Sequence, residues 1–180
     1  MEKKRNIIAT VFSVLAIVSL ILVTFDVLNY AEFYKAMERF QIGLENVALD
    51  ESRINEGEVI VKVQLRATNP TEFAGLEISS VLCHLKYVKD GVPRFLAGLS
   101  KELSPPVTAR PSQATILELD FDLKHSGQES LVRDFIGYLQ KNPEKIDWVI
   151  TGQTTMEAYR SVFEIMIGPF EYSTSLTSSV

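Results

Sequence analysis

The 180-residue sequence predicts a mainly β protein: an antiparallel β-sandwich of about seven strands, Greek-key in the immunoglobulin or fibronectin type III manner, with one helix. A transmembrane helix is predicted before the sandwich. Three observations lead to this prediction. An uncharged apolar run occupies residues 7–25, apolar and polar residues alternate in short segments from residue 40 onward, and Gly and Pro signals separate those segments.

The apolar run from Ile7 to Phe25 predicts a membrane anchor. Its 19 residues would form a helix of about 28 Å, close to the hydrocarbon thickness of a bilayer. The basic residues 3–5 before it and Asp26 after it favour a cytoplasmic N-terminus. The alternative is a cleaved secretory signal, but the run exceeds the usual 7 to 15 or so residues and no small-residue cleavage site follows. We therefore expect residues 1–6 as a cytoplasmic tail, 7–25 as a single span of the cell membrane, and the rest outside the cytoplasm.

Residues 26–39 predict a helical stalk that continues the anchor. Val27, Tyr30, Tyr34 and Met37 recur at three- and four-residue spacing, as on one face of a helix. Tyr30, Phe33 and Tyr34 are placed at the membrane–water interface by this reading, because amphipathic rings favour that depth. A helix that packs on its own domain explains the pattern as well, and this alternative stays open.

Alternation at period two predicts the strands of a domain spanning residues 40–171. The expected strands are residues 40–49, 59–67, 76–88, 94–103, 115–123, 146–154 and 159–167. Asn69-Pro70 ends the second strand, Pro105-Pro106 the fourth and Gly168-Pro169 the last, because proline cannot donate to a sheet ladder. Residues 172–180 are rich in Ser and Thr and predict a disordered tail.

One helix, from Ser126 to Gln140, is predicted between the fifth and sixth strands. Ser126 with Glu129 three residues later forms a capping box. An apolar stripe at helical spacing is formed by Leu131, Phe135 and Leu139, with Val132 and Ile136. We expect this helix to cover one open end of the sandwich.

Charge and cysteine content narrow the function. The chain carries 18 basic and 23 acidic residues, a formal net charge of −5, with no basic cluster after the N-terminal tail. Such a balance excludes nucleic acid as an expected partner. Cys83 is the only cysteine, so no intrachain disulfide can form and the core alone must hold the domain together.

Few residues suit catalysis or metal binding. Cys83 and His84 are strand neighbours and point to opposite faces, so they cannot chelate one ion, and His125 lies far along the chain. Glu118, Asp120 and Asp122 share one strand face and are expected to be a solvated surface, while Trp148 is expected in the core. We predict no catalytic residue, no metal, no cofactor and no enzyme activity.

Residues 40–170 resemble a known family at several points. Phe40–Leu49 is similar to its opening strand, residues 59–70 (VIVKVQLRATNP) to its strand ending in Asn-Pro, and residues 148–152 (WVITG) to the strand-plus-glycine near its end. The chain thus resembles the late-embryogenesis-abundant group-2 family, whose domain is the water-stress and hypersensitive-response (WHy) domain. The resemblance implies a β-sandwich, a role in desiccation or other stress, and Asn69, Pro70 and Gly152 as structural rather than catalytic positions.

Three functions remain open at this stage. The first is a membrane-anchored structural or interaction module at the cell envelope, with the bilayer and possible other membrane proteins as partners. The second is an accessory subunit of a larger membrane complex, for which a small-residue stripe of Ser13, Ala16 and Ser19 would allow close helix approach. The third is binding of an apolar ligand or lipid between the sheets. That pocket would be lined by Phe73, Phe95, Phe121 and Phe163.

Overall fold

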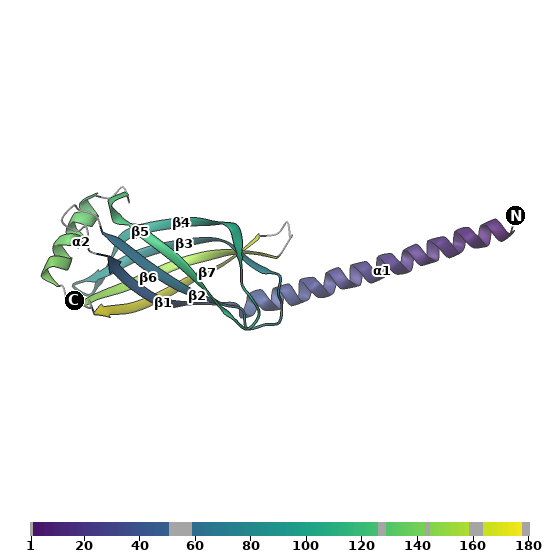
Figure 1. Ribbon diagram of the computed structural model, residues 1–180, viewed down its shortest axis with the longest axis horizontal. Helices are drawn as coiled ribbons and strands as arrows, with labels where there is room; N and C mark the ends of the chain where they lie inside the picture. The colour runs from purple at the N-terminus through teal and green to yellow at the C-terminus, as the bar shows by residue number, and fades with distance from the viewer. Residues whose placement is uncertain (1, 51–58, 126–128, 143–144, 159–163, 178–180) are drawn as a thin grey trace.

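The computed structural model of the chain describes every residue except 1, 51–58, 126–128, 143–144, 159–163 and 178–180 (Figure 1). Its two α-helices are α1 (Glu2–Arg39) and α2 (Glu129–Lys141), and a short 3₁₀ turn, η2, spans Leu123–His125. Its strands are β1 (Gln41–Asp50), β2 (Ile60–Thr68), β3 (Leu76–Lys89), β4 (Val92–Thr108), β5 (Ala114–Asp122), β6 (Lys145–Ala158) and β7 (Glu164–Thr177).

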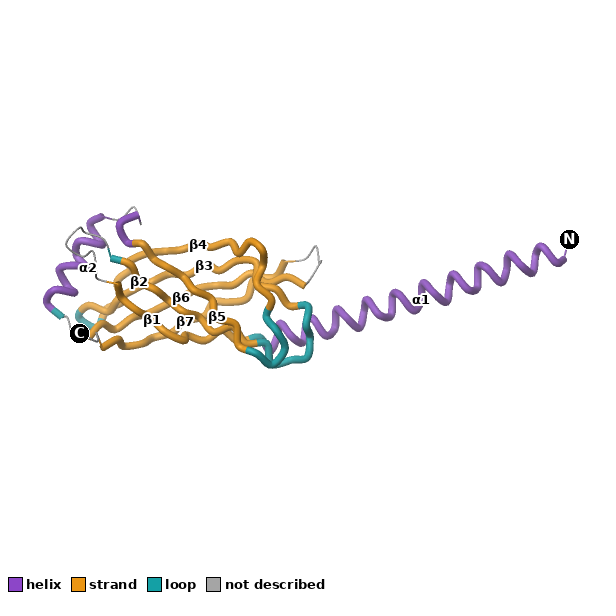
Figure 2. The backbone as a smooth tube through the Cα atoms, viewed as in Figure 1, coloured by secondary structure: helices purple, strands orange, loops and turns teal. Residues whose placement is uncertain are grey.

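The seven strands form two sheets that face each other, so the predicted antiparallel sandwich is confirmed. One sheet has the order β1-β2-β5 and the other β4-β3-β6-β7. All the pairings are antiparallel. The chain crosses between the sheets after β2, β4 and β5, as a Greek-key sandwich requires (Figure 2).

Strand β2 shows why these sequences form a sandwich. Val61, Val63, Leu65 and Ala67 are fully buried at alternate positions, while Lys62 and Arg66 between them are exposed. Each buried aliphatic side chain contributes about 2 kcal/mol relative to an exposed one. The same alternation of buried and exposed residues runs along β5, which was predicted at residues 115–123. The alternation in the sequence therefore predicts the positions of both strands.

Helix α2 covers the end of the sandwich far from α1, as predicted (Figure 1). Its buried face is Val132, Phe135 and Leu139. The ring of Phe135 lies 5.0 Å from that of Tyr87 and 5.6 Å from that of Trp148, measured between centroids. Trp148 is fully buried there, which confirms it as a core residue. The expected cap, Ser126, lies outside the described residues.

Helix α1 runs unbroken from Glu2 to Arg39, and only its last turns enter the body. Phe33 is 2% exposed and Ala36 fully buried, and Phe40 just after the helix is 8% exposed. Tyr30 and Tyr34, which were expected on one face of the stalk, are exposed, at 43% and 57%. Placing Phe33 at the membrane–water interface was therefore wrong, because its ring packs into the body.

Two predicted strand ends are also wrong. Strand β4 continues past Pro105-Pro106 to Thr108, and residues 103–106 form a bulge opposite Ser79. Strand β7 continues past Gly168-Pro169 to Thr177. Both are edge strands, where a backbone N–H can face solvent, so a proline need not remove a hydrogen bond from the sheet.

The predicted disordered tail changes accordingly. Residues 172–177 pair with residues 145–150 of β6 and belong to the sheet. Residues 178–180, and the predicted strand start at residues 159–163, lie outside the described part of the chain.

Candidate functional site

The end of the sandwich next to α1 is organised by Asn69, the first residue of the predicted Asn-Pro motif. Its side chain is fully buried. The amide Nδ2 donates to the carbonyl oxygens of Phe73 (2.7 Å) and Ala109 (3.1 Å). The amide Oδ1 accepts from the backbone N–H (3.1 Å) and the hydroxyl (2.7 Å) of Thr71. Both donors and both lone pairs of the amide are therefore used.

Asn69 thereby ties two loops together. Its backbone carbonyl accepts from Ser112 N (2.8 Å), and it forms an isolated parallel bridge with Pro111. Exposed Pro70 follows and fixes the chain direction as it leaves β2. The loop from Asn69 to Gly75 is thus held by side-chain hydrogen bonds rather than by a sheet ladder.

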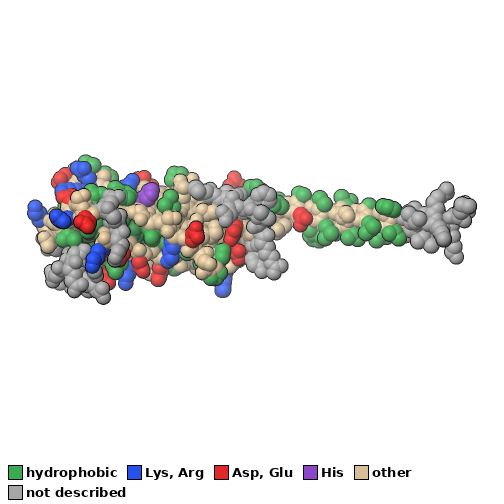
Figure 3. Space-filling view, turned by 90° about the horizontal axis from the view of Figure 1, so that it is seen from above, with side chains coloured by type: hydrophobic (Ala, Val, Ile, Leu, Met, Phe, Trp, Pro, Cys, Tyr) green, Lys and Arg blue, Asp and Glu red, His purple; other side chains and the backbone are tan. Residues whose placement is uncertain are grey.

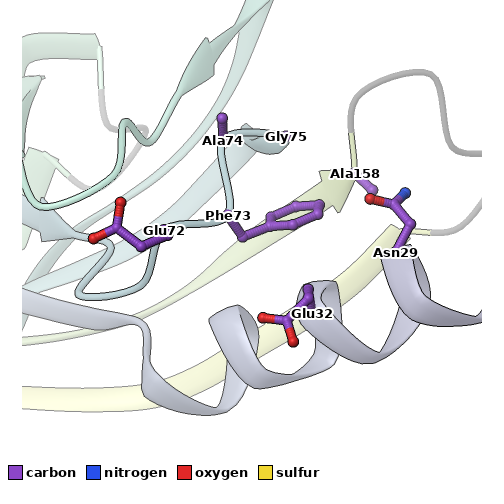
Figure 4. Close-up of a pocket in the computed structure, with 7 residues that line it drawn as sticks. All are labelled: Asn29, Glu32, Glu72, Phe73, Ala74, Gly75 and Ala158. Carbon is purple, nitrogen blue, oxygen red and sulfur yellow. The ribbon is translucent and has the colours of Figure 1, made fainter. Parts of the chain in front are cut away.

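That loop receives the end of α1. The ring of Phe73 lies 5.9 Å from the ring of Phe33, centroid to centroid. Beside this contact a groove of about 450 Å³ opens between the helix and the loop. Figure 4 shows the ring of Phe73 above the helix, with Asn29 and Ala158 on one side of it and Glu72 on the other.

Gly152, the other predicted motif residue, has a separate role in β6. A Cβ at this position would lie 2.4 Å from the carbonyl oxygen of Leu82 and 2.6 Å from the ring of Phe170. Both distances are far shorter than van der Waals contact, so the close approach of β3 and β7 to β6 requires glycine here. The structure therefore places Asn69 and Gly152 at different points of the sandwich.

The predicted anchor residues both lie in α1. Ile7 is in the helix, and Phe25 is 66% exposed. Thr10–Arg39 is the one helical stretch, within the described residues, that is long and apolar enough to cross a membrane, and its most apolar 18-residue window has a mean hydropathy of 2.6. Figure 3 shows apolar side chains along the visible face of this helix, whereas acidic and basic side chains are mixed over the body.

The residues considered for chemistry are dispersed. Cys83 is fully buried, and burial raises the pKa of its thiol to about 12, so it stays protonated and unreactive. His84 points to the opposite face, where its ring meets that of Phe95 at 5.9 Å. The side chain of His125 lies outside the described residues. No group of three potential metal ligands occurs among the residues that the structure describes.

The acidic side chains of β5 lie on the solvent face. Asp120 and Asp122 are exposed, and Glu118 accepts a hydrogen bond from Gln64 at 3.1 Å. Asp134 of α2 has more partners than the sequence suggested. It accepts from Tyr87 OH (2.8 Å) and pairs with Lys89 Nζ (2.8 Å). The Lys89 ammonium and then the Tyr87 hydroxyl hold the pKa of Asp134 below its usual range.

The aromatic residues considered for a lipid pocket do not gather in one place. Phe121 is buried in the core, Phe73 packs on Phe33, and Phe95 lies against His84 on the outer face. Phe163 lies outside the described residues. The two open sides of the sandwich are also bridged. Tyr172 OH donates to the carbonyl of Ile42, and Lys101 Nζ donates to the carbonyl of Glu118 at 2.9 Å.

No family model and no curated protein matches the sequence. The chain is similar to the solution structure of a candidate late embryogenesis abundant (LEA) protein, with a TM-score of 0.51, 15% identity, and coverage of 82% of this chain and 76% of that one. The body has an LEA-like fold. At this identity the similarity establishes the fold alone, and it agrees with the resemblance seen in the sequence.

Two further structures are similar to the chain at lower TM-scores. A solution structure of a protein from Arabidopsis thaliana has 17% identity and a TM-score of 0.45, covering 76% of this chain and 77% of that one. A crystal structure of a protein from Archaeoglobus fulgidus has 18% identity and a TM-score of 0.42, covering 78% and 96%. The fold assignment of the LEA-like body depends on neither of them.

Sequence reasoning missed Phe33 as the residue that joins the apolar helix α1 to the LEA-like body. A signal for it was present, since Phe33, Ala36 and Phe40 are spaced three and four residues apart. The partnership of Asp134 with Tyr87 and Lys89 had no local signal, because these residues are more than 40 positions apart in the chain.

Proposed function

We propose that this chain is a single-pass membrane protein whose LEA-like body acts outside the cytoplasm as a non-enzymatic structural or interaction module, with a role in protection against drying or related stress. The observation that carries the proposal is the contrast within α1. Every described side chain from Thr10 to Glu32 is exposed, whereas Phe33 and Ala36 are buried in the body.

The exposed part of α1 needs an apolar environment. Thirteen large hydrophobic residues between Val11 and Leu28 are 47–68% exposed. Burying such a side chain is worth about 1.5–3 kcal/mol, so the row as a whole favours transfer out of water by tens of kcal/mol. A bilayer provides that environment around an isolated helix, and the basic residues at positions 3–5 favour an N-terminus in the cytoplasm.

The composition of the LEA-like body supports a binding or structural role over catalysis. Cys83 is buried with a raised pKa, and His84 faces the other way. The buried polar side chains among the described residues are Asn69 and Thr154. Asn69 is fully engaged in holding the loops. A protective role is the one that the resemblance to the LEA group-2 family implies.

The proposal is tested by fractionation of cells that express the full chain with a C-terminal tag. We expect the chain to stay in membranes after an alkaline wash, to keep its full mass, and to lose its body to protease added from outside. Release by the wash, or a mass shortened by the first 25 or so residues, would support a cleaved signal and overturn the anchor.

A pair of variants controls this experiment. Leu15→Lys combined with Ile21→Lys should abolish membrane retention, because each charge at the centre of a span costs about 3 kcal/mol. Leu15→Ala combined with Ile21→Ala should be retained. The stress role is tested by drying cells with and without the chain. Equal survival with the full chain, the lysine variant and no chain would contradict that role.

A further inference from the structure

The anchor and the LEA-like body form one continuous unit without a flexible tether. Helix α1 ends at Arg39 and β1 begins at Gln41, so a single residue, Phe40, separates helix from strand. Phe40 N donates to the carbonyl oxygen of Met37 at 3.2 Å, and the Phe40 side chain is itself buried. The contact of Phe33 with Phe73 fixes the helix against the loop that Asn69 holds.

The height of the LEA-like body above the membrane follows from helix geometry. Asn29 lines the groove together with Phe73 and Ala158, so the body reaches down to the level of Asn29 (Figure 4). Asn29 lies four residues past Phe25, the end of the apolar run, which corresponds to about 6 Å along the helix. The headgroup layer of each leaflet is itself about 5–7 Å thick.

The surface that meets this layer is defined here as the proximal face: residues 70–75 and 109–113 together with Asn29 and Glu32. Its exposed loop residues are Pro70, Glu72, Ala74, Arg110, Ser112 and Gln113. The loop residues carry one acidic and one basic side chain, and the carboxylate of Glu32 is paired with Lys35 Nζ at 2.7 Å, so the face carries no excess charge. That composition suits zwitterionic lipid headgroups and gives no attraction to an anionic surface.

We propose that the proximal face rests directly on the zwitterionic headgroups of the leaflet from which α1 emerges, which holds the LEA-like body upright in one orientation. This inference depends on the proposed membrane anchor. The opposite end, with α2, then stands far from the bilayer. Strand β6, from Lys145 to Ala158, alone extends about 43 Å at 3.3 Å per residue between the two ends.

The test uses the full-length chain in phosphatidylcholine nanodiscs that contain a lipid with a quencher on its headgroup. A thiol fluorophore is attached through Ala74→Cys on the proximal face, or through Lys141→Cys at the far end as a matched control. Both positions are exposed, while the native Cys83 is buried and stays unlabelled. We expect the proximal label to lose most of its emission and the distal label to keep most of it.

A third variant tests the fixed height without altering the LEA-like body. Insertion of Gly-Ser-Gly-Ser-Gly between Asp26 and Val27 should restore much of the proximal emission, because a flexible segment lets the body move away from the surface. Emission that is unquenched at the proximal label, or unchanged by the insertion, would overturn the inference. Failure of the chain to co-elute with the discs would overturn the proposed anchor instead.

Discussion

Replacing Asn69 with alanine removes the side chain that organises the end of the sandwich next to α1. The amide is fully buried and makes four hydrogen bonds: two to carbonyl oxygens and two from Thr71. Alanine can make none of them. The carbonyl of Ala109 would lose this amide donor inside the protein, whereas the groups of Thr71 and Phe73 lie closer to solvent.

The size of the effect follows from this difference in burial. An acceptor left unsatisfied in the interior costs about 1–3 kcal/mol, and each partly buried hydrogen bond contributes about 0.5–1.5 kcal/mol. For one interior bond and three partly buried bonds, we expect a loss of about 4 kcal/mol in the free energy of unfolding. In a domain of this size, such a loss lowers the melting temperature by about 14 °C.

Denaturant unfolding of the full chain in detergent, followed by Trp148 emission, measures this loss. Trp148 is the only tryptophan and is buried at the far end, so its emission reports unfolding of the LEA-like body. Asn46→Ala removes an exposed asparagine on β1 and should change stability by less than about 0.5 kcal/mol. Asn69→Asp keeps the acceptors but sets a carboxylate against two carbonyl oxygens, and should destabilise at least as much as alanine. A loss below about 1 kcal/mol for Asn69→Ala would refute this reasoning, because it falls short of the cost of the interior acceptor alone.

Three further results are expected. Gly152→Ala should destabilise the body by about 1–3 kcal/mol in the same unfolding assay, because the new Cβ would overpack the sheet. Gly137→Ala on helix α2 should instead stabilise the body by about 0.5–1 kcal/mol, because no atom lies near the new Cβ and alanine favours a helix. The folded-state pKa of Asp134 is lowered by Lys89, so its stabilisation is present above the unfolded value and is lost as the pH falls below about 4. Asp134→Asn should therefore flatten the acid limb of the stability profile, and an unchanged limb would contradict the assignment. Burial raises the pKa of Tyr87 to about 12. The contribution of the Tyr87 phenol to the free energy of unfolding should therefore persist up to about pH 10 and disappear as the pH rises through 12. A comparison of the absorbance titrations of the native chain and Tyr87→Phe should show one phenol that ionises late.

Much of the sandwich could be predicted because its signals are local. In β2 the alternation of Val61, Lys62 and Val63 gives both the strand and the face that it buries. Helix α2 was equally readable, since Val132, Phe135 and Leu139 lie on one side at helical spacing. These patterns depend on neighbours within a few residues and not on the order of strands in the sheet.

The predicted strand ends and the predicted disordered tail were wrong where the structure depends on pairing between strands that are distant in the sequence. Pro105 and Pro169 read as strand ends, yet both lie within strands, because β4 and β7 occupy the edges of their sheet. Edge position depends on which strands pair, and no local pattern encodes it. The disordered tail was overpredicted for the same reason, since its Ser and Thr residues gain their order from pairing with β6.

The Asn-Pro motif has a second structural role in this chain that its sequence alone does not predict. Asn69 shapes the loop that carries Phe73, and Phe73 packs on Phe33 of the helix. The sequence of α1 offers two faces that could pack on the body, one with Tyr30 and Tyr34 and one with Phe33 and Ala36. The second face packs on the body, because Phe73 of the loop contacts Phe33. A residue identified as a strand terminator thus also determines how the apolar helix joins the LEA-like body, so the fold and the seating of the helix depend on the same buried amide.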